Sequence, residues 1–77
     1  MSRAHDRESW MHPVDEAILR YLAVERTEYP ALIANRIGSH TGHVERRCAV
    51  LERREYVEAV SGEVVYRITD RGRNWLD

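Results

Sequence analysis

Apolar residues recur at helical spacing in the first part of the chain. Val14, Ile18 and Leu22 are separated by four residues each, so they share one face of a helix predicted over roughly residues 14–26. Asp15 falls in the first turn of this helix, where the positive end of the helix dipole favours an acidic side chain. The pattern therefore predicts an amphipathic helix after a polar lead.

A shorter helix is predicted to follow, after a short connector at Thr27-Glu28-Tyr29. Pro30 suits its first turn, and residues 31–37 place apolar side chains on one face. Gly38 ends the helix, because glycine adopts the left-handed cap conformation without strain. Ser39 or Thr41 is expected to cap the next helix with its hydroxyl group. Two helices joined by a short glycine turn are thus predicted in the middle of the chain.

The third predicted helix, Thr41 to Arg54, carries a narrow apolar stripe. Val44, Cys48 and Leu51 lie within a sector of about 60° when the helix is unrolled at about 100° per residue. This stripe is expected to face the core. The outward face is led by His43, Arg46 and Arg53.

After the third helix the sequence changes to the period of strands. Residues 56–60 tend toward alternation, 61–63 are typical of a tight turn, and 64–68 are rich in β-branched and aromatic residues. A last short helix begins at Thr69-Asp70. The order of elements predicts an α+β fold of the winged helix-turn-helix type, with three helices, a β-hairpin wing and a short C-terminal helix.

The chain length of 77 residues predicts one domain, placed at residues 13–77 after a flexible lead-in over 1–12. Within the lead-in, Trp10 is the exception and is expected to dock on the domain or on a partner. No apolar run approaches the roughly 20 residues of a membrane span, and no signal-peptide core is present, so a cytoplasmic protein is expected. A core this small, with Trp10 and Trp75 near the two ends, predicts a homodimer.

Positive charge gathers in one segment, although the whole chain carries a net charge of −1. Residues 36–54 contain five arginines and two glutamates, whereas 1–35 and 55–68 each carry a net charge of −2. A local basic patch is what binding to a phosphate backbone requires. The distribution therefore favours double-stranded DNA as the partner of the third helix.

The outward face of the third helix combines arginines with small residues, as a helix inserted in the major groove needs. Arg46 is the best candidate for reading guanine, since its guanidinium pairs with O6 and N7 together. Arg47, between the two faces, is expected to do the same or to hold a phosphate. Alternatively, Arg46 and Arg53 only solvate an exposed helix, paired locally with Glu45 or Glu52. The predicted DNA-binding residues are Thr41, His43, Arg46, Arg47, Arg53 and Arg67.

Three stretches resemble winged helix-turn-helix transcriptional regulators. Residues 44–57 are similar to their recognition helix and first wing strand, 15–22 to their first helix, and 68–76 to their closing strand and helix. All twelve basic residues are arginine. With lysine missing, the chain is similar to small haloarchaeal regulators related to a haloarchaeal phage repressor. The resemblance covers about residues 13–76 and implies a DNA-binding regulator, expected to be a repressor and a homodimer.

The chain departs from this family pattern at the helix end and at the wing. Many such regulators have glycine where this chain has Glu55, so the end of the third helix must adopt another geometry. The wing tip carries Glu63, and Arg67 is the one basic residue of the wing. The acidic wing favours an alternative function, a protein-interaction module without DNA binding. RNA binding is a third interpretation.

Other chemistries lack the residues they require. His40, His43 and Cys48 share a region, but Cys48 is expected to face inward and His43 outward, so no zinc site is predicted. A redox sensor needs an exposed thiol, whereas Cys48 is expected to face inward. No glycine-rich phosphate loop, Ser-His-Asp order or carboxylate pair is visible. We therefore expect no enzyme, no cofactor, no metal and no small-molecule effector.

Overall fold

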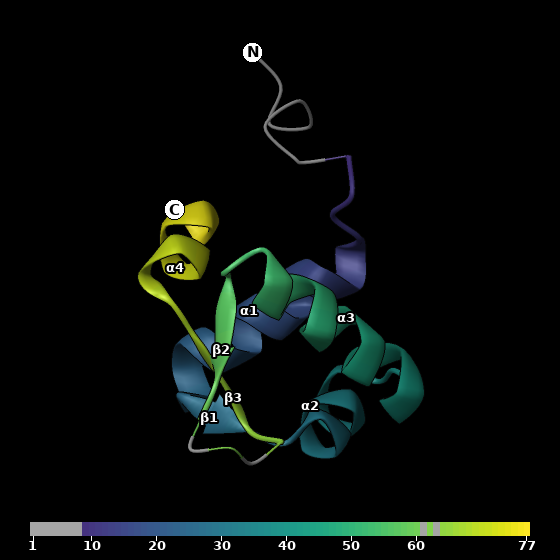
Figure 1. Cartoon of the computed structure of the whole chain (residues 1–77). Coiled ribbons are helices and arrows are strands. Elements are labelled where there is room, and N and C mark those ends of the chain that lie inside the picture. Colours follow the sequence, from purple (N-terminus) through teal and green to yellow (C-terminus); the bar gives the residue numbers. More distant parts are fainter. Residues whose placement is uncertain (1–8, 61, 63) are drawn as a thin grey trace.

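The computed structural model describes residues 9–60, 62 and 64–77 and has the predicted order of elements with one addition (Figure 1). In Figure 1, α2 and α3 lie on one side of the molecule, and the hairpin and α4 lie on the other. The elements are α1 (Pro13–Glu25), β1 (Thr27–Glu28), α2 (Pro30–Ile37), α3 (Thr41–Arg53), β2 (Val57–Ala59), β3 (Tyr66–Ile68) and α4 (Asp70–Leu76).

Helix α1 is the centre of the packing. It contacts α2, α3 and α4 as well as strands β1 and β3. Its buried face is formed by Ile18, Leu19 and Leu22, each with no exposed surface. Burying one such side chain contributes about 1.5–3 kcal/mol relative to leaving it in water, so this face anchors the small core. The other elements add Met11, Ile33, Ala34, Val44, Cys48, Leu51, Tyr56, Val57 and Ile68.

The turn between α2 and α3 has the predicted glycine stop but a different start for the third helix. Gly38 has φ 75° and ψ 40°, the left-handed conformation, and the Ser39 amide donates to the Ala34 carbonyl at 2.9 Å. The N-cap of α3 is His40, which makes no side-chain cap hydrogen bond. The expectation that Ser39 or Thr41 caps α3 is therefore wrong, because Thr41 is already the first helical residue.

The sheet contains a strand that the sequence pattern did not predict. Its order is β1-β3-β2, all antiparallel, with Thr27 opposite Arg67 and Val57 opposite Ile68. Thr27 and Glu28 were expected to form a plain connector. Two residues are too few for alternation to be visible, and they become a strand only because β3 supplies hydrogen-bond partners. The hairpin strands themselves are confirmed, each shorter than predicted.

Residues 10–12, the last part of the predicted lead-in, contact the domain. Met11 is part of the core, with 5% of its surface exposed. The Trp10 ring packs edge-on against Tyr56, with ring centroids 5.4 Å apart, and Arg54 stacks over it at 4.6 Å. Residues 10–12 are thus held against the domain. Residues 1–8 of the predicted lead-in and Glu63 lie outside the described residues.

Helix α3 ends in a Schellman motif built around a glutamate. The amide of Tyr56 donates to the Leu51 carbonyl and the amide of Glu55 to the Glu52 carbonyl, both at 2.9 Å. Glu55 has φ 69°, in the left-handed region that glycine occupies at least cost. With Glu55 in place of glycine, the Schellman motif is kept, but Glu55 holds a backbone conformation that is strained for a residue with a Cβ.

Replacing Glu55 by glycine is expected to stabilise the domain by about 1 kcal/mol, because the left-handed conformation no longer strains a Cβ. Urea unfolding measures the change. Glu55→Gln should have little effect, since it removes the charge and keeps the strain. Glu52→Gly, within the same helix, should destabilise by about 1 kcal/mol. A loss of stability in Glu55→Gly would contradict the assignment.

Candidate nucleic-acid interface

The two faces of α3 differ as predicted. Val44, Cys48 and Leu51 have no exposed surface. On the other side, Arg46 and Arg53 are exposed. Within the described part of the chain neither guanidinium forms an ion pair or hydrogen bond, so the alternative in which Glu45 or Glu52 pairs with them does not occur here.

The outward face is hollowed along its length. A shallow groove of about 450 Å³ lies beside α3. Its α3 side consists of the half-buried His43, Ala49 and Val50 and the longer arginines. A Cβ added at Gly42, at the start of α3, would lie 3.5 Å from Arg46 Nη1, which is an ordinary van der Waals contact. Small residues between long donors allow a ligand to approach the helix backbone closely. Its lining residues are His12, His43, Arg46, Arg47, Ala49, Val50 and Arg53.

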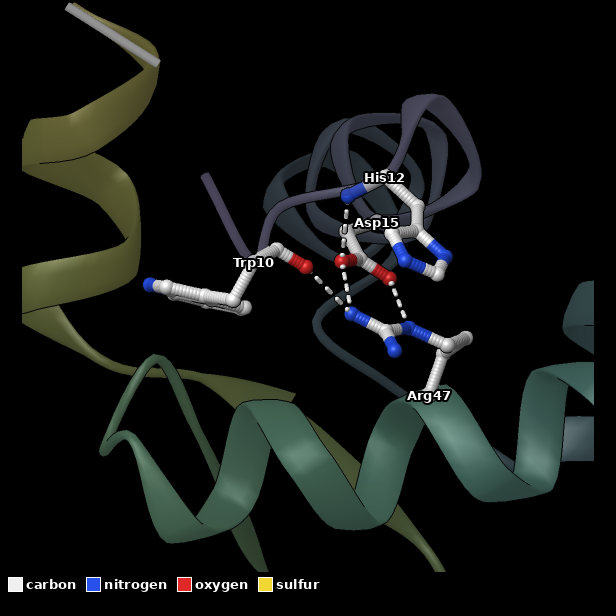
Figure 2. Close-up of polar contacts among 4 residues, drawn as sticks. All are labelled: Trp10, His12, Asp15 and Arg47. Atoms are coloured by element: carbon white, nitrogen blue, oxygen red, sulfur yellow. Dashed lines mark hydrogen bonds and ion pairs between the residues drawn. The ribbon is translucent and has the colours of Figure 1, made fainter. Parts of the chain in front are cut away.

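Arg47 occupies a different position from the other predicted contacts. Its side chain is 13% exposed and forms a bidentate ion pair with Asp15, which is fully buried. Arg47 Nε donates to Asp15 Oδ1 at 2.9 Å, and Nη2 donates to Oδ2 at 2.7 Å and to the Trp10 carbonyl at 2.9 Å. Figure 2 shows this guanidinium rising from α3 toward the start of α1. The hydrogen bonds to Asp15 raise the pKa of Arg47, so its guanidinium stays charged.

Sequence reasoning missed the burial of Asp15. The pair joins α1 to α3 across 32 positions of the chain, and the Asp15 carboxylate also accepts the His12 amide at 2.9 Å. A first-turn acid is normally solvated, which is why only its dipole role was expected. Asp15 nevertheless precedes Ile18 and Leu22 by three and seven residues, the spacing of the buried face. An acid on an apolar stripe was the available signal for a buried partner.

The wing offers little positive charge. Arg67 Nε donates to Glu58 Oε2 at 2.6 Å across the hairpin, and both side chains are about half exposed. Burial and then the charges of Glu52, Cys48 and Glu45 raise the pKa of Tyr66. Helical period puts Glu45 and Glu52 on one flank of α3, and His43 and Arg47, which line the groove, on the other flank.

Thr41 is exposed as the first residue of α3, and His43 is half-buried at the groove. The structure thus gathers His43, Arg46 and Arg53 around one groove and leaves Thr41 and Arg67 outside its lining.

Cys48 is buried, and its thiol has a pKa raised by burial to about 12. Among residues 9–60, 62 and 64–77, no group of three or more His, Cys, Asp or Glu side chains is placed to hold a metal ion.

A family model described as the winged helix-turn-helix phage repressor matches residues 4–77. The chain belongs to this family. Membership confirms the α+β winged helix-turn-helix fold and the resemblance carried by the recognition helix, and it supports a DNA-binding regulator. No helix in the described part of this repressor-family chain is long and apolar enough to cross a membrane.

Two solved structures are similar to this phage-repressor-family chain. The PhiH1 repressor-like protein from Haloarcula marismortui is 27% identical, with a TM-score of 0.80 over 88% of this chain and 78% of that one. MarR from E. coli is 15% identical, with a TM-score of 0.76 over 86% of this chain and 48% of that one. At that identity the second likeness concerns the fold alone. No curated protein matches the chain.

Proposed function

We propose that this protein is a transcriptional regulator, acting as a repressor, that binds duplex DNA sequence-specifically with α3 in the major groove. The observation that carries the proposal is the outward face of α3, where Arg46 and Arg53 are exposed and without ionic partners among the described residues. Unpaired arginines beside small side chains suit contacts with base edges and phosphates. Membership of a phage repressor family supports the same conclusion.

The proposed contacts differ in kind along α3. Arg46, near the middle, reads a base edge, with guanine as the base whose O6 and N7 fit its donors. Thr41 and His43 contact bases or phosphates at the start of the helix, and Arg53 holds the backbone at its end. Arg67 contributes only where a phosphate replaces Glu58 as its partner. Arg47 is proposed to position α3 through Asp15 rather than to contact DNA.

A second copy of the chain is proposed to bind alongside the first. One α3 reads only a few base pairs, and two related copies on a near-palindromic site multiply that readout. Two half-sites are then expected about 34–36 Å apart, one helical turn, or a multiple of that distance. The ring of Trp10 packs against Tyr56 within its own chain, so it offers little support for a dimer.

The test is selection of duplexes from a random pool by the wild-type protein, followed by fluorescence anisotropy with the selected duplex. Arg46→Ala is expected to weaken binding by about 1–3 kcal/mol, roughly 5- to 150-fold, and to relax the preference at one base pair. Arg20→Ala is the matched control, because Arg20 is exposed on α1 and pairs only with Glu16. It should bind almost as wild type does.

Selected sequences should contain an inverted repeat with the spacing given above, and sedimentation with the duplex should give two chains per site. If the wild-type protein enriches no duplex at any salt concentration, the proposed function is wrong, and the protein-interaction module becomes the better hypothesis.

A further inference from the structure

One wall of the groove beside α3 comes from another helix. His12, the N-cap residue of α1, lines the groove together with the α3 residues His43 and Arg46. Its side chain is exposed, and Figure 2 shows the imidazole held over α3 next to the Arg47 side chain. The groove therefore extends from the outward face of α3 to the start of α1. No periodicity along the sequence connects His12 with the groove residues of α3.

The backbone around His12 is fixed by the buried ion pair. The His12 amide donates to Asp15 Oδ2 at 2.9 Å, and the carbonyl of Trp10, two residues earlier, accepts from Arg47 Nη2 at 2.9 Å. Trp10 itself is packed between Tyr56 and Arg54. The imidazole is thus carried by a rigid segment, so a ligand in the groove would find it already in place.

Among the described residues, the lining of the groove contains no acidic side chain. The carboxylate of Asp15 is fully buried and bound to Arg47. Helical period puts Glu45 and Glu52 on the flank of α3 away from His43 and Arg47. The free charges at the groove are those of Arg46 and Arg53, with two imidazoles beside them. This charge distribution suits an anion.

We infer that this groove holds a backbone phosphate of the bound DNA and that His12 is one of its contacts. The inference rests on the proposed function, and it extends the interface from α3 toward α1 and away from the wing. A helix in the major groove lies between two phosphate backbones, so the strand next to the α1 side of α3 passes over the groove. An imidazole N–H donates to a phosphate oxygen there, and Arg53 supplies charge.

The test compares His12→Ala and His12→Arg with the wild-type protein on the selected duplex, by anisotropy at several salt concentrations. His12→Ala should weaken binding about 3- to 10-fold, the effect of losing one hydrogen bond of ordinary strength. His12→Arg should restore the affinity and steepen the dependence of log K on log salt by about 0.9, as one added phosphate contact does. Pro13→Ala is the control for a perturbed helix start and should bind as wild type.

A second measurement locates the contact on the DNA. Each phosphate of the duplex is replaced in turn by an uncharged methylphosphonate, and the loss of affinity is compared between wild type and His12→Ala. At the phosphate that His12 contacts, the loss should be smaller in the variant. The inference fails and the proposed function stands if His12→Ala has the wild-type affinity and the wild-type loss at every methylphosphonate position, while Arg46→Ala binds weakly. If the wild type binds no DNA, both fail.

Discussion

Replacing Asp15 by alanine is expected to destabilise the domain by about 3–5 kcal/mol, because Arg47 then remains largely buried without its partner. The change also removes the acceptor for the His12 amide at the start of α1. A domain of this size has a stability of about 4–12 kcal/mol, at roughly 0.05–0.15 kcal/mol per residue, so the loss approaches the whole margin. Urea unfolding of the purified variants measures it.

The matched control replaces both partners. Asp15→Leu combined with Arg47→Met puts apolar side chains of similar volume between α1 and α3, and the stability should return to within about 1 kcal/mol of wild type or rise above it. Arg47→Ala alone should cost about as much as Asp15→Ala, because it leaves a fully buried carboxylate. A loss below about 1 kcal/mol in either single variant would show that the pair is not buried as described.

The same variants separate the roles of two neighbouring arginines. Arg46→Ala should weaken DNA binding and leave the free energy of unfolding nearly unchanged, because Arg46 is exposed. Arg47→Met in the Asp15→Leu background should leave a folded protein whose α3 still presents Arg46. If that double variant loses DNA affinity as strongly as Arg46→Ala, Arg47 is a DNA contact in its own right.

The thiol of Cys48 is expected to be unreactive in the folded protein. Burial, followed by the charges of Asp15, Glu45 and Glu52, raises the pKa of the thiol to about 12, from an ordinary value of about 8.5. The thiolate fraction near pH 8 then falls roughly a thousand-fold. Labelling with a thiol-specific disulfide reagent should be that much slower in native buffer than in urea. Rapid native labelling would contradict the inward position of Cys48.

The raised pKa of Cys48 also fixes the direction of a stability change with pH. The folded state holds the thiol proton more tightly than the unfolded chain, so the stabilisation is complete below about pH 8.5 and is lost as the pH rises toward 12. Burial is also the largest cause of the raised pKa values of Tyr21 and Tyr66, so these two groups change the stability with pH in the same direction. The difference between wild type and Cys48→Ala isolates the thiol and should shrink over that alkaline range.

The sequence alone determined the elements whose cause is local. The stripe Val44-Cys48-Leu51 follows from helical period, and it correctly placed Arg46 on the opposite side of α3. Gly38 ended α2 as expected, since only a local backbone conformation was needed there. The winged helix-turn-helix fold could be recognised because the order of such elements, rather than any single contact, defines it.

Only the tertiary structure decided which charged groups form ion pairs within the domain and which remain unpaired among the described residues. Arg47 and Arg46 are neighbours in the sequence and equal in chemistry, yet α1 brings Asp15 to Arg47, while no described residue forms an ion pair with Arg46. The same packing makes Thr27-Glu28 a strand and brings His12 beside α3. These outcomes depend on contacts between residues far apart in the chain, and periodicity carries no information about which distant residue arrives opposite a given side chain.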